Sequence, residues 1–457
     1  KHMSTTQQSS IPLCDPVACV AAGCDPIVCK GAGVPSNVTL FERSARVIPG
    51  GVNSSIRAFK AVGGSPYVVA RGSGAHVYDV EGTRYIDLVQ SYGAVILGHA
   101  HPAITAALRE AAVDGTSFGA PTPREMKLAE AISERVPSCE RVRFMNSGTE
   151  ATSTVVRLAR GLTGRAKIII FSGNFHGATD ALLAAGGSGV ATLGIPGTAG
   201  VPPEAVANTI VAPYNVIPDI DETVAAVIVE PVAANMGVVA PVPGFLEGLR
   251  RACDKAGALL IFDEVITGFR LGPDGAQGRY SVKPDLTCFG KVIGGGLPIG
   301  AVGGRQDIME NLTPLGKVFH AGTLAGNPMA TAAGLAALSQ LTPDVYRLLE
   351  TRATRLASLI TEATSAAGLP VTTSRVGTLV GIFLGDALGS DCLPINFDEA
   401  KRTDEKLFAR FFHALLAQGV AMAPGAYEAI FVGLGHDDVV MDDLAERFHR
   451  AALAVAL

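Results

Sequence analysis

Short apolar runs alternate with amphipathic segments between about residues 102 and 341. The runs with a strand pattern are RVRFMN, KIIIFS, AAVIVEP, ALLIFDEV and LTCFGK, and helices are expected over residues 152–161 and 244–256. Continuous apolar strands separated by helices are typical of a parallel sheet that helices cover on both faces. The pattern therefore predicts a large α/β domain with a parallel or mostly parallel sheet.

The pattern changes on both sides of this region. Before it, a helix is expected from about residue 41, and two strand-like stretches, 75–79 and 85–88, flank a turn at Glu81-Gly82. After about residue 342, amphipathic helices are expected over 345–363 and 405–418, with short strands such as 377–383 between them. These segments predict a second, smaller lobe.

The length of 457 residues exceeds what a single hydrophobic core usually serves. We expect a cysteine-rich leader over 1–35 and an N-terminal segment over 36–75 that joins the small lobe. The large domain is expected over 76–341 and the small C-terminal domain over 342–457.

Composition and charge narrow the possible partners. Hydrophobic residues make up 48% of the chain and charged residues 17%, which favours a packed enzyme over a disordered or fibrous chain. The formal net charge is −5 and no basic run could follow a phosphate backbone, which argues against nucleic acid. No apolar run reaches the ~20 residues of a spanning helix, and no signal-peptide pattern opens the chain. We therefore expect a cytoplasmic protein that acts on a small molecule.

The eight cysteines form two sets. Four lie singly in the body and fit buried thiols in a reducing compartment: Cys139, Cys253, Cys288 and Cys392. Four others recur every five residues in a leader with a ten-residue near-repeat: Cys14, Cys19, Cys24 and Cys29. The leader could chelate a soft metal, form disulfides or be dispensable, and it lacks the C-x2-C spacing of a zinc site.

A long segment over residues 186–203 is rich in Gly, Pro, Ser and Thr. At this length it is expected to be a lid over an active site, and the alternative is an ordinary surface loop.

The sequence Asn146-Ser147-Gly148-Thr149-Glu150-Ala151 follows a predicted strand and opens a predicted helix. Backbone N–H groups at a helix N-terminus, with hydroxyl groups and a glycine beside them, can bind a phosphate. The same residues also fit a simple N-cap with a capping residue three positions on. The motif alone leaves both interpretations open.

Two further strand ends carry Asp263 and Lys291. Because ligands of doubly wound sheets lie beyond the carboxyl ends of the strands, these side chains are expected to face one crevice. A lysine amine kept neutral in such a pocket can bond to an aldehyde cofactor, and a carboxylate can keep a pyridine nitrogen protonated.

Further sequence motifs resemble a known family. The order SGTEA, FHG, EP at Glu230-Pro231, DEV, a lysine 28 residues after Asp263, and AGTLAGNP resembles the class III, fold-type I aminotransferases that use pyridoxal phosphate. Within them, IPGGVNSSIRAF, ILGHAHP, SFGAPTP, GSGVATLG, DEVITGFR and GKVIGGGLPIGAVGG are similar to the glutamate-1-semialdehyde 2,1-aminomutases. The resemblance runs from about residue 40 to the C-terminus. It implies a mostly parallel seven-stranded sheet covered by helices in the large domain and a smaller α+β domain.

The resemblance also implies a cofactor, pyridoxal 5'-phosphate or pyridoxamine 5'-phosphate, and residues that bind it. Lys291 is expected to bond to it and to move protons, and Asp263 to pair with its ring nitrogen. Asn235 is expected to contact its phenolic oxygen. The FHG motif places Phe175 and His176 beside it.

The phosphate of the cofactor is expected at the start of the helix, held by Ser147, Gly148 and Thr149. Thr323 matches the family threonine that reaches this phosphate from the other subunit. The resemblance therefore implies a homodimer with a shared active site.

The implied reaction is an internal amino transfer that converts glutamate 1-semialdehyde to 5-aminolevulinate, a step of porphyrin biosynthesis. Arg57 matches the family arginine that binds the substrate carboxylate, for which its planar fork is suited. Ser54 and Tyr92 are expected at the same subsite, and Glu428 near the amino groups of the substrate.

Several pocket positions depart from the family pattern: Phe175 replaces Tyr, Tyr92 replaces Trp, Phe319-His320 replaces Tyr-Gln, and Ala325 replaces Ser. Because such contacts set specificity, a two-substrate aminotransferase for a β- or ω-amino acid or amine stays open. A third alternative is a regulator that binds a cofactor or a metal without catalysis and works through its cysteine leader.

Overall fold

The structure is a computed structural model that describes residues 35–184, 198–385 and 392–457. The predicted cysteine leader and most of the predicted lid over 186–203 lie outside the described residues. None of the described helices has both the length and the apolar character that crossing a bilayer requires.

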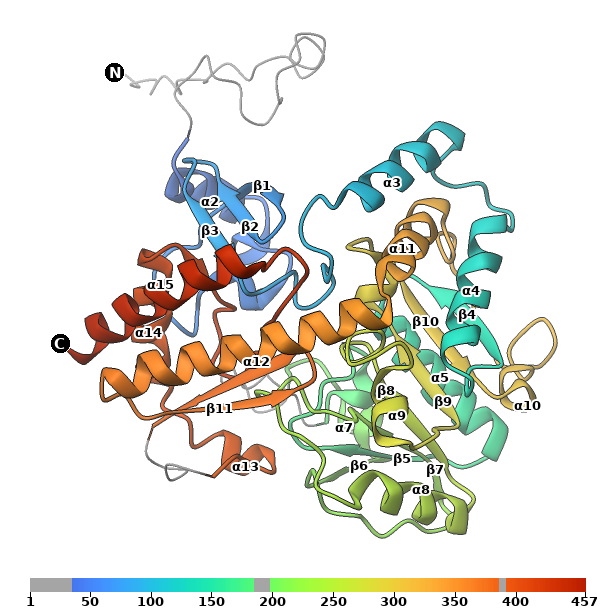
Figure 1. Ribbon diagram of the computed structural model, residues 1–457. Helices are drawn as coiled ribbons and strands as arrows, with labels where there is room; N and C mark the ends of the chain where they lie inside the picture. The colour runs from blue at the N-terminus through green and yellow to red at the C-terminus, as the bar shows by residue number, and fades with distance from the viewer. Residues whose placement is uncertain (1–34, 185–197, 386–391) are drawn as a thin grey trace, which may run out of the picture.

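A seven-stranded sheet forms the centre of the large domain (Figure 1). In spatial order its strands are β4 (Arg141–Met145), β10 (Gly300–Gly304), β9 (Leu286–Phe289), β8 (Leu259–Asp263), β7 (Val224–Val229), β5 (Lys167–Phe171) and β6 (Thr209–Ala212). Pairing is parallel from β9 through β8, β7 and β5 to β6, whereas β10 is antiparallel to both of its neighbours. The predicted mostly parallel seven-stranded sheet is confirmed.

Two of these strands, β6 and β10, were not expected from the apolar pattern. Strand β10 has the sequence GAVGG, and glycine usually weakens a strand interior because it offers no side chain to pack. Here one glycine, Gly300, allows β10 to lie very close to another backbone segment. A Cβ added at Gly300 would lie 2.1 Å from the carbonyl oxygen of Ser147, so only glycine lets β10 pass beside the start of the helix that follows β4.

Successive side chains of a strand point to opposite faces of the sheet, and helices cover both faces. On one face, Ile168, Ile170 and Ile228 pack with helix α5 (Gly148–Thr163). On the other face, Ile169 and Phe262 pack in the core that includes helix α8 (Phe245–Ala256). Helix α5 begins four residues before the predicted start at 152, because Ser147 caps it.

A second helical group lies beside β4 and β10. Helix α11 (Pro328–Gln340) packs against α3 (Pro102–Asp114), α4 (Pro123–Arg135) and the short helix η4 (Lys291–Gly294). It therefore supports the turn that carries Lys291. Shorter helices elsewhere are α2 (Asn37–Ala45), η1 (Pro49–Gly51), η2 (Ser55–Ala58), η3 (Asp180–Leu182), α7 (Pro203–Val206), α9 (Gly275–Tyr280), α10 (Gln306–Met309) and α13 (Phe397–Ala400).

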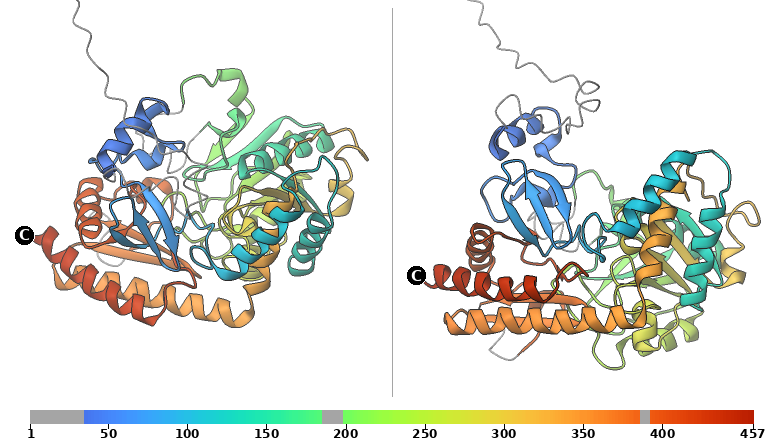
Figure 2. Two further views of the ribbon diagram at one scale, coloured as in Figure 1. Left: turned by 90° about the horizontal axis from the view of Figure 1, so that it is seen from above. Right: turned by 45° about the horizontal axis from the view of Figure 1, so that its top comes forward.

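The smaller lobe combines both ends of the described chain (Figure 2). Its long helices α12 (Pro343–Ala366) and α15 (Asp438–Ala456) pack side by side, and α14 (Glu405–Ala417) packs on α15. Its three-stranded sheet has the order β11 (Val371–Val376), β12 (Leu379–Leu384) and β14 (Ile430–Phe431), so the predicted strand over 377–383 is the second half of a hairpin.

The other small sheet has the order β1 (Val69–Ser73), β2 (His76–Asp79), β3 (Arg84–Asp87) and β13 (Val420–Ala421). Strand β13 pairs in parallel with β3, and this joins the N-terminal strands to the C-terminal part. The domain limits stay a prediction, and this pairing favours a limit near residue 88 over the predicted limit at residue 76.

The close approach at Gly300 yields the first prediction. Gly300→Ala should lower the free energy of unfolding by ~1–3 kcal/mol or more, because the added methyl group meets rigid backbone. Gly322→Ala is the control, since its nearest atoms would lie 3.3 Å and 3.4 Å away. Denaturant unfolding of both variants measures the effect, and equal stabilities would contradict the assigned packing.

Candidate active site

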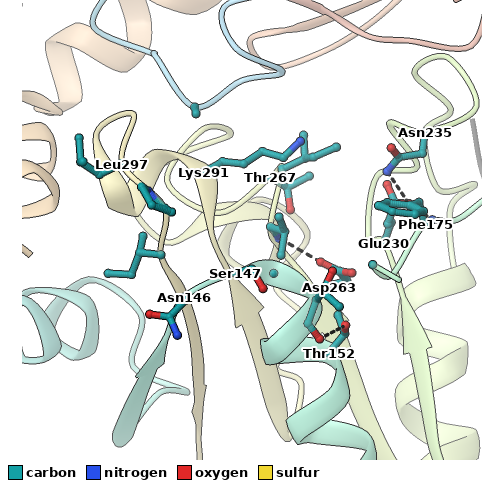
Figure 3. A pocket seen from close by; sticks show the side chains of 18 of the residues that line it. Asn146, Ser147, Thr152, Phe175, Glu230, Asn235, Asp263, Thr267, Lys291 and Leu297 are labelled. Atoms are coloured by element: carbon teal, nitrogen blue, oxygen red, sulfur yellow. Dashed lines mark hydrogen bonds between the residues drawn. The ribbon is translucent and has the colours of Figure 1, made fainter. Parts of the chain in front are cut away.

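A cavity of about 470 Å³ opens at the carboxyl ends of β8 and β9 and at the start of α5 (Figure 3). A second cavity of about 430 Å³ adjoins it, and the two share Phe175, Asn235, Ile266 and Lys291 in their walls. The predicted residues Ser147, Gly148, Thr149, Phe175, Asn235, Asp263 and Lys291 all line the first cavity. The sequence prediction that strand ends would bring Asp263 and Lys291 to one crevice is thus confirmed.

The start of α5 supports both interpretations of its sequence. The Ser147 hydroxyl accepts a hydrogen bond from the Glu150 N–H at 3.2 Å, which is an N-cap. The Glu150 carboxylate turns back and accepts from the Asn146 N–H at 2.8 Å. Ser147, Gly148 and Thr149 nevertheless face the cavity, so the positive end of the helix dipole points into it.

Asp263 is buried at the end of β8 and is held on both oxygens. Its Oδ2 lies 2.7 Å from His176 Nδ1, and its Oδ1 accepts from the Val265 N–H at 3.1 Å. The backbone of His176 is fixed in turn, because the Thr152 hydroxyl donates to its carbonyl group at 2.7 Å. His176 therefore holds Asp263 from behind, outside the cavity wall.

Lys291 lies two residues after the end of β9, and its own backbone has a left-handed φ of 47°. Its Nζ donates to the backbone carbonyl oxygen of Tyr92 at 2.9 Å. Burial lowers the pKa of this amine from its ordinary 10.5 to about 8, against the opposing charges of Glu428, Glu230 and Asp263. A substantial fraction of the amine is neutral near pH 8, as a nucleophile or a proton acceptor requires.

The Tyr92 carbonyl group, which accepts the hydrogen bond from Lys291 Nζ, belongs to a strained turn. Gln90, Ser91 and Tyr92 have φ values of 47°, 51° and 54°, and Gly93 follows with 94°. Left-handed backbone costs about 1–2 kcal/mol for each residue with a side chain. Strain of this kind collects at functional sites.

Glu230 lies in the wall of the first cavity and has no role in the sequence prediction, although Glu230-Pro231 is one of the motifs of the resemblance. Its Oε1 accepts from the Phe175 N–H at 2.6 Å and from Asn235 Nδ2 at 2.9 Å, and its Oε2 accepts from the Ala234 N–H at 3.0 Å. One buried carboxylate thus fixes two cavity-lining residues. Burial raises its pKa to about 7.

Three of the four residues predicted for substrate binding line the second cavity, and the fourth does not. Ser54, Tyr92 and Glu428 line the second cavity, together with apolar side chains. Arg57 in η2 is exposed, and neither cavity includes it in its wall. Its positive charge still lowers the pKa of the Tyr92 hydroxyl, whereas burial and the charge of Glu428 raise this pKa.

Thr323 lies apart from both cavities. It is exposed and lines a third, surface cavity formed by residues 117–122, 322–323, 325–328 and Glu125. His320 likewise lines neither of the first two cavities. Within one described chain, these residues do not meet Lys291.

The low pKa of Lys291 yields the second prediction. The rate at which an aldehyde reagent is captured by the cofactor-free protein should rise with pH through a midpoint near 8 rather than 10.5. At pH 8 the neutral fraction would then exceed that of an ordinary lysine by about a hundredfold. Absorbance changes measure the capture, and Lys291→Ala gives the background from other lysines. A midpoint above 10 would contradict the burial of the amine.

Comparison with known proteins places this geometry in a family. The family described as "Aminotransferase class-III" matches residues 59–432. A glutamate-1-semialdehyde 2,1-aminomutase of Bordetella avium is 51% identical over 413 residues, covering 89% of this chain and 96% of the relative. A glutamate-1-semialdehyde 2,1-aminomutase 2 of Geobacillus kaustophilus is 50% identical over 407 residues, covering 88% and 94%.

Solved structures agree on the fold. An omega-transaminase from Sphaerobacter thermophilus has a TM-score of 0.82 and 33% identity, covering 93% of this chain and 99% of that one. A glutamate-1-semialdehyde-aminomutase from Pseudomonas aeruginosa PAO1 in complex with PMP has a TM-score of 0.80 and 26% identity, covering 92% and 94%. The expected fold-type I architecture is confirmed, and the chain belongs to the class-III aminotransferase family.

Proposed function

We propose that the chain converts glutamate 1-semialdehyde to 5-aminolevulinate by intramolecular amino transfer with pyridoxal or pyridoxamine phosphate. The observation that carries the proposal is the identity of about half of all residues, over nearly nine tenths of the chain, with relatives named for this reaction. The cavity supplies the matching chemistry, because it presents a buried amine of low pKa and a buried carboxylate.

The residues present fit this cofactor. The start of α5 would hold the phosphate, Asp263 would pair with the ring nitrogen, and Phe175 would lie against the ring. Asn235 would contact the phenolic oxygen. When bound, the cofactor supplies an electron-accepting ring and a position that carries the amino group.

The chain's own residues explain how protons and substrate are handled. Lys291 would take a proton and return it, since its pKa of about 8 lies near neutral pH. The Tyr92 carbonyl group receives the ammonium form. Arg57 would bind the substrate carboxylate, and Glu428 would attract its amino groups by charge.

The apolar wall of the second cavity limits water around these groups. Ile56, Ile266 and Phe431 line it beside Lys291. Exclusion of water strengthens the electrostatic interactions inside and protects reactive carbonyl compounds. This supports a reaction in which the substrate must be held through two amino transfers.

A homodimer is part of the proposal, with Thr323 completing the phosphate site of the partner subunit. Its exposure, apart from the two cavities that contain Lys291 in its own chain, supports this role. Three exposed apolar side chains lie in the segments 117–122 and 322–328 or close to them, and they suit an interface: Phe118, Phe319 and Leu324. We also propose a cytoplasmic location, in keeping with Cys139, Cys253, Cys288 and Cys392, which are free thiols.

A two-substrate aminotransferase is the second candidate. The omega-transaminase structure is 33% identical to this chain, whereas the aminomutase structure is 26% identical. Tyr92 and Phe175, which depart from the aminomutase pattern, both line the second cavity. This is the observation that favours the alternative.

The third prediction separates the two functions. Purified enzyme given glutamate 1-semialdehyde alone should form 5-aminolevulinate over many turnovers, because the amino group returns to the same carbon skeleton. Colorimetric detection measures the product, and Lys291→Ala should fall to the uncatalysed background. Product that stops at one equivalent of enzyme until 2-oxoglutarate or pyruvate is added would instead establish the aminotransferase.

The fourth prediction concerns Glu230. Glu230→Gln replaces one accepting oxygen by an amide that cannot accept from the N–H groups present, which costs ~1–3 kcal/mol. We expect the cofactor to dissociate about ten times faster or more, with correct folding by circular dichroism. The exposed Glu222→Gln is the control. Unchanged cofactor retention would show that Glu230 does not position Phe175 and Asn235.

A further inference from the structure

Arg270 is a fully buried cation in the loop that follows β8. Its Nη2 donates to the Gly93 carbonyl oxygen at 2.7 Å and its Nη1 to the Val432 carbonyl oxygen at 3.1 Å. The Cζ atom lies 5.1 Å from the centre of the Phe431 ring. In the part of the chain that the structure describes, no carboxylate forms an ion pair with it. Burial lowers its pKa to about 9, so it stays charged at neutral pH.

The two carbonyl groups belong to segments that border the active site. Gly93 ends the left-handed turn, and the preceding carbonyl group, that of Tyr92, receives Lys291 Nζ. Val432 follows Phe431, which lines the second cavity. The contact is tight, since a Cβ added at Gly93 would lie 2.7 Å from the Phe431 ring and 3.4 Å from Arg270 Nε. Arg270 thus ties the turn to the C-terminal segment from behind.

We propose that Arg270 is the positioning residue of the reactive lysine. By binding the Gly93 and Val432 carbonyl groups, it holds the turn so that the Tyr92 carbonyl oxygen stays where Lys291 donates to it. It also keeps a fixed positive charge behind the lysine. The inference rests on the proposed function only for the chemical role of Lys291.

Electrostatics support the second part of this role. Burial lowers the pKa of Lys291 most, the charges of Glu428, Glu230 and Asp263 raise it, and the charge of Arg270 lowers it. Three acids would favour the ammonium form, and Arg270 opposes them. Tyr346 is the titratable group that acts on Arg270 itself.

Two substitutions separate the contribution of the planar guanidinium group of Arg270 from that of its positive charge. Arg270→Lys keeps a positive charge but loses the planar fork that reaches both carbonyl groups. Arg270→Met removes the charge as well. Arg352→Met is the matched control, because Arg352 is partly buried and donates to the Leu434 carbonyl oxygen at 2.8 Å, two residues after Val432 in the same C-terminal segment.

The first measurement is amide hydrogen exchange of the purified holoenzyme, read from a peptide over residues 88–95. The Gly93 and Val95 N–H groups bond to the Gln90 carbonyl oxygen inside the turn. Both Arg270 variants should exchange at least about tenfold faster there, while Arg352→Met should exchange like the wild type. Wild-type exchange in a folded Arg270→Lys variant overturns the proposal, even if Arg270→Met fails to fold.

The second measurement is a pH titration of the cofactor's visible absorption band. Loss of the positive charge in Arg270→Met should move the midpoint to higher pH, whereas Arg270→Lys should keep it. A midpoint unchanged in Arg270→Met overturns the electrostatic part. Neither readout needs a substrate. A wild type that makes no 5-aminolevulinate, with both effects present, refutes the proposed function and leaves the role of Arg270 standing.

Discussion

Removal of water from the Lys291 amine is the constraint on which the rest of the site depends. In water this amine would be almost fully protonated at neutral pH, whereas burial brings its pKa to about 8. Burial also requires partners within the protein for most of the polar atoms beside it. The geometry of Asp263, Glu230 and Arg270 follows from that requirement.

Each of these buried charges makes hydrogen bonds that also place a neighbour. His176 and a backbone N–H hold Asp263, and Glu230 gathers N–H groups from two loops. Arg270 donates to two backbone carbonyl groups and lies over the Phe431 ring. Because buried hydrogen bonds are costly to lose, electrostatics as well as packing fixes the positions of these side chains.

The sequence reveals those parts of the site that follow from local pattern. Apolar runs place Asp263 and Lys291 at strand ends, and the residues after RVRFM predict the start of α5. The role of Glu230 and the strained turn at Tyr92 could not be predicted, since both depend on backbone groups that meet only in three dimensions. Strand β10 was missed because its glycines serve a close approach rather than a strand preference. The roles assigned to single site residues stay predictions.

The parallel pairing of β3 with β13 has a consequence for synthesis of the chain. Ile86 pairs with Val420, which leaves the ribosome about 330 residues later. Until then one edge of the N-terminal sheet is open, and open strand edges invite pairing with other chains. Nascent chains are thus vulnerable to aggregation through this edge, and a truncation that removes β13 would expose it permanently.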